Sequence, residues 1–269
     1  MSEMHLSALY RYPVKSLAGQ ALEHSLVDGF GLADDRRWML VDREGRYVTQ
    51  RELPEMALIS ASLDQRRLTL NAPGMTPLAV DPPSDNAEPI NVQIWRDRCQ
   101  ARLCSNEAQI WLSRYLGHTL RLVYMAEGER RQVDRAYAEE GDLTAFSDGF
   151  PLLLISQASL DDLNGRLEQA LPMIRFRPNL VVAGCEPYAE DGWSLIRIGE
   201  MTLRVVKPCS RCKITTIDPY TAEVGDEPLK TLAGYRRQGN QVFFGQNLIH
   251  DGPGELKLGM PVEVLRYAE

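Results

Sequence analysis

Short apolar runs separated by turn-forming residues recur along the chain and predict many short strands. The run 38–41 precedes an Asp-Arg-Glu-Gly turn and the segment 46–49, which together predict a hairpin. Residues 72–88 are rich in proline and lack an apolar pattern, so we expect a loop there. Further strands are expected at 8–12, 58–63, 67–70, 94–103, 121–125, 151–155, 179–183, 194–198, 202–207, 212–217, 242–247 and 261–265.

Two segments show helical spacing instead. In 106–116 the apolar residues recur at intervals typical of a helix, and Gly117 stands where a C-terminal cap is expected. A second amphipathic helix is expected over 158–171, with leucines on one face and Ser156 or Ser159 as its N-cap. The segment 126–143 is highly charged, which indicates an exposed connection.

Many short strands and few helices favour a mainly β fold with some α, in which the strands form a barrel-like architecture. The chain has 269 residues, enough for one large domain or two smaller ones. The strand pattern restarts sharply at Pro151, after the charged segment. We therefore expect a domain boundary between about residues 105 and 145.

The charge balance limits the classes of partner. Lysine and arginine number 30 against 37 aspartates and glutamates, for a formal net charge of −7. This balance argues against a general nucleic-acid binder, although it leaves room for a local basic pocket. No stretch approaches about 18 unbroken apolar residues, so no membrane span is expected.

Five cysteines in a chain of this length do not suit a disulfide scaffold. The first eight residues also lack a basic segment followed by an apolar run, which is the pattern of a secretory signal. We therefore expect a cytoplasmic protein with reduced cysteines.

Several familiar signatures are missing from the sequence. It contains neither a glycine-rich phosphate loop of the Rossmann or P-loop type nor a Gly-x-Ser-x-Gly elbow. The four histidines are scattered without a His-x-x-x-His spacing, so a histidine-based zinc enzyme is poorly supported.

One cysteine pair, Cys209 and Cys212, has the spacing of a metal or redox motif. A zinc site would need a second such pair, and a thioredoxin-like site would need a helix N-terminus, whereas Ile-Thr-Thr-Ile predicts a strand here. A third interpretation is a single thiolate ligand for a soft metal, favoured by the flanking cations Lys207, Arg211 and Lys213. Two buried thiols with no chemical role are a fourth.

Basic residues stand at the predicted ends of several strands. Lys15 and Ser16 follow one strand, while Arg36 and Arg177 precede others. Each alone is typical of a solvated strand end. Together with Arg211 they would suit the anionic tail of a cofactor, because guanidinium and ammonium groups bind phosphate well.

The cysteine segment 209–219 resembles the hallmark of MOSC-domain proteins, which are related to the C-terminal part of molybdenum cofactor sulfurase. Within that family the chain resembles the mitochondrial amidoxime-reducing component and its bacterial counterparts. The resemblance implies an N-terminal β-barrel domain over 1–120 and a MOSC-type β-barrel domain over 121–269. It is carried by segments 12–16, 31–40 and 49–51, and then by 148–151, 156–167, 176–179, 184–185, 188–191, 228–232 and 244–247.

The resemblance implies a molybdenum cofactor, Mo-molybdopterin, in which a pterin dithiolene with a terminal phosphate holds one metal atom. Cys212 is implied as the molybdenum ligand and catalytic residue, and Cys209 as its neighbour. The residues implied to bind the cofactor are Lys15, Ser16 and Arg36 in the first half, and Asp148, Gly149, Arg177, Asn179, Ser210 and Arg211 in the second.

The implied activity is the reduction of N-hydroxylated small molecules through cleavage of their N–O bond, with Asp148 and Asp218 as candidate proton donors by position. The sequence shows neither ferredoxin-type cysteine spacing nor a membrane segment. We therefore expect an external electron donor of the ferredoxin or flavin type and no membrane contact.

Two other functions stay open on the sequence. One is a carrier of the cofactor, or of persulfide sulfur on Cys212, without turnover of its own. The other is a β-rich protein whose cysteines belong to the core.

Overall fold

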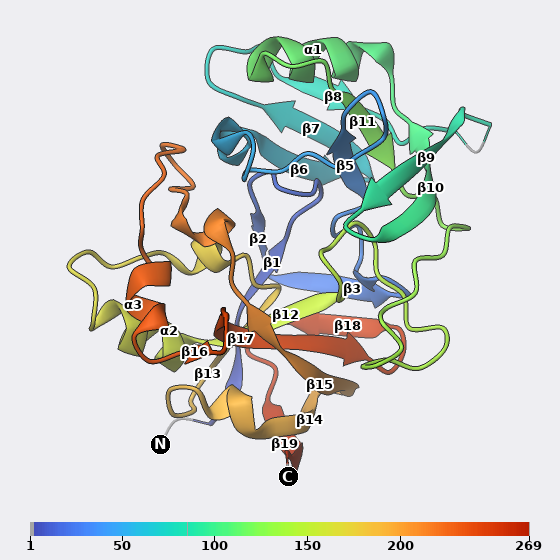
Figure 1. The fold of residues 1–269 in the computed structure, drawn as a ribbon. Helices are drawn as coiled ribbons and strands as arrows, with labels where there is room; N and C mark the ends of the chain where they lie inside the picture. Colours follow the sequence, from blue (N-terminus) through green and yellow to red (C-terminus); the bar gives the residue numbers. More distant parts are fainter. Residues whose placement is uncertain (1–2, 85, 269) are drawn as a thin grey trace.

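The computed structural model describes residues 3–84 and 86–268, and strands dominate it (Figure 1). The largest sheet is antiparallel throughout except where β12 and β13 run parallel. Its order is β19 (Val262–Tyr267), β14 (Trp193–Ile198), β15 (Met201–Ser210), β17 (Gln241–His250), β12 (Leu152–Ser156), β13 (Leu180–Ala183), β1 (His5–Arg11) and β2 (Gln20–Leu22), with β16 (Arg237–Gln238) on β17.

Three smaller antiparallel sheets complete the strand structure of the described residues. One has the order β5 (Trp38–Val41), β11 (Arg121–Tyr124), β10 (Asp97–Leu103) and β9 (Pro89–Ile94). The second joins β18 (Gly254–Lys257), β3 (His24–Asp28) and β4 (Gly31–Leu32). The third joins β6 (Ser60–Asp64), β7 (Arg67–Asn71) and β8 (Leu78–Val80). The expectation of a mainly β fold with some α is confirmed.

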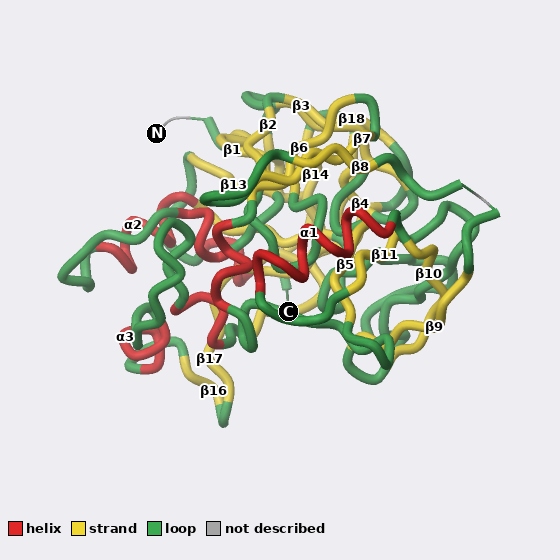
Figure 2. Tube along the Cα trace, turned by 90° about the horizontal axis from the view of Figure 1, so that it is seen from above, coloured by secondary structure: helices red, strands yellow, loops and turns green. Residues whose placement is uncertain are grey.

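The helices are short and lie outside the sheets. Helix α1 lies at the top of the molecule in Figure 1. In Figure 2, which is seen from above, it crosses the middle of the picture, and α2 and α3 lie together on one side. Among the described residues the α-helices are α1 (Asn106–Leu116), α2 (Gln157–Asn164) and α3 (Leu229–Ala233), and the 3-10 helices are η1 (Pro54–Leu58), η2 (Met173–Phe176), η3 (Ala189–Gly192) and η4 (Lys213–Thr216). None of these helices is long and apolar enough to cross a membrane.

Helix α1 has the bounds that the sequence predicts. The Ser105 hydroxyl accepts a hydrogen bond from the Ala108 N–H, and Gly117 ends the helix in the left-handed conformation. Helix α2 is capped by Ser156 as expected but ends at Asn164, short of the predicted 158–171. Gly165 follows, and the Asn164 side chain accepts a hydrogen bond from the Leu171 N–H, which stabilises a turn in place of further helix.

Strand pairing crosses the proposed domain division near residue 120. Strand β1 pairs with β13, and β3 pairs with β18, so the first strands of the chain lie in sheets of the second half. In the other direction, β11 pairs with β5 and β10. The chain therefore passes between the upper and lower parts of Figure 1 more than once.

Two predicted strands that matter for the site differ in the structure, because 212–217 is not a strand and 94–103 is interrupted by a turn. Within this segment Lys213–Thr216 form the 3-10 helix η4, because the hydroxyls of Thr215 and Thr216 donate to the carbonyls of Cys212 and Lys213 and stabilise a tight turn. Residues 94–103 form the end of β9, a turn and β10, with Trp95 in the left-handed region at φ +54°. The turn carries the Trp95 side chain toward the second half.

Gly245 in β17 offers a test of the central sheet. Its φ is +81°, and a Cβ there would lie 2.6 Å from Ile155 Cγ1 and 2.8 Å from the Leu154 carbonyl oxygen. Gly239, before β17, also has a positive φ of +59° but no atom within 4 Å of such a Cβ. We expect Gly245→Ala to lower the free energy of unfolding by about 1–3 kcal/mol more than Gly239→Ala, measured by urea denaturation. Equal losses would contradict this packing.

Candidate functional site

One groove brings all ten predicted site residues together. It lies between the two halves and leaves about 740 Å³ free of protein atoms, part of it open to solvent. Predicted residues from both halves line it: Lys15, Ser16, Arg36, Asp148, Gly149, Arg177, Asn179, Ser210, Arg211 and Cys212. Their roles in binding stay predictions.

Three of these residues have a strained backbone. Ser16, Arg36 and Arg177 adopt φ values of +64°, +48° and +57°, a region that residues with a Cβ rarely occupy. Neighbouring backbone holds two of them there, since the Arg36 N–H donates to the Tyr12 carbonyl and the Arg177 N–H to the Ile174 carbonyl. Such strain costs of order 1–3 kcal/mol per residue and concentrates at functional sites.

Two of the arginines share an aromatic support. The guanidinium carbon of Arg36 lies 4.3 Å from the ring centroid of Tyr12, and that of Arg177 lies 4.2 Å from it. Asp35 pairs with Arg36. Burial, together with the like charge of Arg36, lowers the pKa of Arg177 to about 10. The structure therefore holds two positive charges close together, an arrangement that an anion between them would stabilise.

Hydrogen bonds tie these arginines across the two halves. Arg36 donates from Nη1 to Asn179 Oδ1 at 3.0 Å and from Nη2 to the Arg177 carbonyl at 3.2 Å. Arg177 donates from Nη1 to the Leu17 carbonyl at 2.6 Å. Asn179, 1% exposed, also donates to the Tyr10 carbonyl. Each half therefore fixes side chains of the other.

Lys15 and Asp148 form an ion pair at the groove. Lys15 is 5% exposed, and its Nζ donates to Asp148 Oδ1 at 2.5 Å and to the Phe146 carbonyl at 2.9 Å. Burial lowers the pKa of Lys15 to about 8, although Asp148 partly offsets that effect. Desolvation inside the groove raises the pKa of Asp148, but Lys15 and Arg51 outweigh it and hold that pKa well below its ordinary range. Both groups are ionised at neutral pH.

The charge of Asp148 bears on the proton donors that the sequence suggested. An ionised carboxylate has no proton to give, so Asp148 is not a donor at neutral pH. Asp218 is not among the residues that line the groove, and its carboxylate pairs with Arg175 at 2.7 Å. Asp148 therefore lacks the charge state of a general acid, and Asp218 lacks the position.

The two cysteines of the motif have different neighbours. Arg211 donates from Nη1 to the sulfur of Cys209 at 3.0 Å and from Nη2 to the Phe176 carbonyl at 2.6 Å. Cys212 lies between the end of β15 and η4, and its sulfur accepts from Arg51 Nη1 at 3.6 Å. All five cysteines are free thiols.

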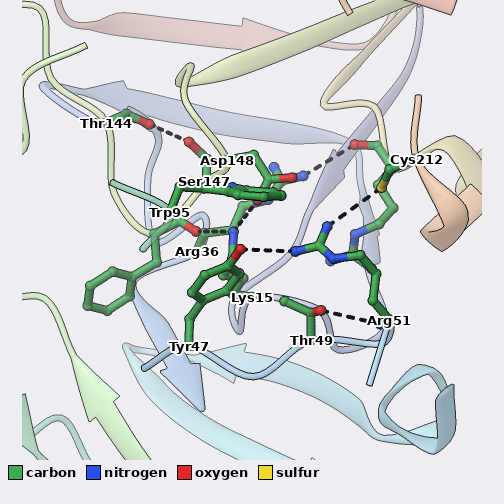
Figure 3. A network of polar contacts seen from close by, with 12 residues as sticks. Lys15, Arg36, Tyr47, Thr49, Arg51, Trp95, Thr144, Ser147, Asp148 and Cys212 are labelled. Atoms are coloured by element: carbon green, nitrogen blue, oxygen red, sulfur yellow. Dashed lines mark hydrogen bonds and ion pairs between the residues drawn. The ribbon is translucent and has the colours of Figure 1, made fainter. Parts of the chain in front are cut away.

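Sequence reasoning missed several side chains that build the site. Figure 3 shows Tyr47, Arg51 and Trp95 beside Lys15, Asp148 and Cys212. The Trp95 Nε1 donates to Asp148 Oδ1 at 3.3 Å. Arg51 belongs to a segment of the family resemblance, which was the available signal, whereas Trp95 lay inside a strand that the sequence predicts as continuous.

Arg131 is a further residue that the sequence did not single out, because its segment looks like an exposed, charged connection. It is 4% exposed and donates to the carbonyls of Ala145, Ser147 and Asp148 at 2.8, 2.7 and 3.2 Å. This guanidinium therefore fixes the loop that presents Asp148 to the groove.

The lowered pKa of Lys15 predicts a pH dependence of stability. Between about pH 8 and the pKa of the unfolded lysine, the unfolded chain holds a proton that folded Lys15 has lost, so the free energy of unfolding rises with pH. The contribution of Lys15 is at most about 3 kcal/mol. Urea denaturation from pH 7 to 10.5 should show this rise in the original protein and lose it in Lys15→Met.

A second variant tests the role of Asp148, the ion-pair partner of Lys15. Asp148→Asn removes the carboxylate that raises the pKa of Lys15, so the rise in stability should begin at a lower pH. The same onset in Asp148→Asn, or the same slope in Lys15→Met, would show that Lys15 does not titrate in this way.

Comparison with known proteins supports the resemblance seen in the sequence. The MOSC N-terminal beta barrel domain matches residues 3–119, and the MOSC domain matches residues 142–263. Mitochondrial amidoxime-reducing component 1 of Mus musculus is 35% identical over 280 residues, covering 97% of this chain and 82% of that protein. The Homo sapiens protein is 35% identical over 279 residues, with the same coverage.

Component 2 of Rattus norvegicus is 34% identical over 278 residues, covering 96% of this chain and 82% of that protein. The likeness thus extends over nearly the whole chain and includes both matched domains. The chain therefore belongs to the MOSC family, in the group that joins a MOSC N-terminal β-barrel domain to a MOSC domain and includes the mitochondrial amidoxime-reducing components.

Proposed function

We propose that this protein is an oxidoreductase that holds a molybdenum–pterin cofactor and reduces N-hydroxylated small molecules with electrons from a separate donor protein. The observation that carries the proposal is the groove itself, where Cys212 lies among side chains suited to a phosphate-bearing pterin. The relatives are named as amidoxime-reducing components, which supports the class of reaction.

The groove fits such a cofactor in its charge and in its unused donors. Within the part of the chain that the structure describes, Arg177 Nη2 and Arg211 Nε are buried nitrogens without a hydrogen-bond partner. Buried N–H groups without acceptors are costly, and a bound phosphate or pterin oxygen would satisfy them. The pairing of Arg36 and Arg177 on Tyr12 likewise favours an anion there.

The residues divide into those that would hold the metal and those that would hold the pterin. The Cys212 thiolate is a soft ligand and suits molybdenum. Lys15, Arg36, Arg177 and Arg211 supply positive charge and N–H donors for the phosphate, and Ser210 and Asn179 add polar contacts. The ionised Asp148 would accept hydrogen bonds from pterin N–H groups.

When bound, the cofactor supplies two-electron redox chemistry. The net reaction converts an N-hydroxy compound to the corresponding N–H compound and water, and consumes two electrons and two protons. The protein's own contribution would be to hold the metal through Cys212 and to orient the pterin through the other side chains that line the groove.

The two electrons would come from a ferredoxin- or flavin-type protein. The relatives are named as components of amidoxime reduction, which supports a separate donor. The absence of membrane contact and of nucleic-acid partners, and a cytoplasmic location, stay predictions from the sequence.

The two motif cysteines provide a matched test of the metal ligand. Cys212→Ser should lower the molybdenum content and the rate of amidoxime reduction by about tenfold or more, because a hydroxyl is a poor ligand for a soft metal. Cys209→Ser, three residues away, should keep both. Molybdenum would be measured by elemental analysis after expression in a host that makes the cofactor, and reduction with a chemical electron donor.

Two results would contradict the proposal. A purified protein without molybdenum would remove the cofactor assignment. A molybdenum-loaded protein that reduces no N-hydroxylated compound would favour the carrier function instead.

A further inference from the structure

Arg51 reaches the proposed metal ligand from the other half of the chain. Its Nη1 donates toward the sulfur of Cys212 at 3.6 Å, across 161 positions of sequence. Figure 3 shows the guanidinium between that sulfur and the ring of Tyr47. This contact differs from the one at Cys209, whose arginine partner, Arg211, is only two residues away in the sequence.

The guanidinium of Arg51 is held in place by aromatic and polar contacts. Its Nη2 donates to the Tyr47 hydroxyl at 3.3 Å, and its guanidinium carbon lies 4.7 Å from the ring centroid of Trp95. Trp95 is 49% exposed, and its Nε1 donates to Asp148 Oδ1 at 3.3 Å. The Arg51 guanidinium therefore has two aromatic neighbours in addition to the sulfur.

The backbone at Arg51 is fixed as well. The Arg51 N–H donates to the Thr49 hydroxyl oxygen at 3.2 Å. The Thr49 N–H and hydroxyl both donate to the Glu52 carboxylate, at 2.9 and 2.5 Å. A tight turn thus places Arg51 before η1. Arg51 is therefore held through both its backbone and its guanidinium, unlike a flexible arginine on the surface.

We propose that Arg51 is a positioning residue that orients the Cys212 thiolate and, through its N–H donor, raises the reduction potential of the bound molybdenum. The inference rests on the proposed function, because it takes Cys212 as the metal ligand. A hydrogen bond to a ligating sulfur withdraws electron density from it and so favours the more reduced metal.

The position of Arg51 has a consequence for how the halves work together. The first half of the chain supplies the donor, and the second half supplies the sulfur. The packing of one half against the other would therefore influence the electronic properties of a metal bound to Cys212.

Two substitutions at Arg51 separate a role at the sulfur from general packing. Arg51→Met keeps much of the side chain's length but has no donor, whereas Arg51→Lys keeps a positive donor. Arg46→Met is the control, because Arg46 is an exposed arginine of the same segment that pairs with Asp42 and Glu44. The molybdenum content, the reduction potential and the electron paramagnetic resonance spectrum of the metal would be measured for each loaded protein.

We expect Arg51→Met to shift the reduction potential to a lower value and to change the resonance spectrum, with partial recovery in Arg51→Lys and no change in Arg46→Met. If Arg51→Met fails to retain molybdenum while Arg51→Lys retains it, the positioning role is supported. An unchanged potential and spectrum in Arg51→Met, or loss of molybdenum from both Arg51 variants, would overturn the inference.

The same samples distinguish this inference from the proposed function. An original protein without molybdenum contradicts the proposed function, and with it the premise for Arg51. A molybdenum-loaded original protein whose potential does not respond to Arg51→Met contradicts the inference about Arg51 alone.

Discussion

The placement of two arginines on one buried tyrosine is the constraint on which the groove depends. Arg36 and Arg177 come from different halves of the chain, and both lie against the Tyr12 ring at just over 4 Å. Like charges this close repel, so the arrangement persists because Asp35, Asn179 and backbone carbonyls hold the guanidinium groups. These contacts offset the repulsion between the two guanidinium groups in the folded protein. The two positive charges are therefore already in place to bind an anionic group.

The topology explains how one groove gathers residues from distant segments. The first strand of the chain lies in the main sheet beside β13, and the loops that leave it carry Lys15 and Ser16 to the junction. From the other side, the turn after η2 brings Arg177, and the end of β15 brings Cys212. Because strands of the first half pair with strands of the second, the fold of the whole chain holds the residues that line the groove in place.

Several residues of the site adopt backbone conformations or a degree of burial that their residue types disfavour. Three lining residues have left-handed φ values, and Lys15 is buried although lysine is seldom fully buried. Each feature opposes folding, and specific hydrogen bonds compensate at Arg36, Arg177 and Lys15, such as those from Lys15 to Asp148 and to the Phe146 carbonyl. Structure that opposes local preference in this way is typical of binding sites.

The sequence by itself determined the mainly β class and the bounds of α1, because periodicity and caps are local, and its resemblance to the MOSC family indicated the residues of the groove. Only the structure showed that Lys213–Thr216 form a 3-10 helix, where local hydroxyl bonds of Thr215 and Thr216 override the strand propensity, and that Trp95 lies at the turn between the paired strands β9 and β10. It also decided that Arg51 contacts Cys212. That contact joins segments far apart in the chain, and its geometry depends on how all the sheets pack.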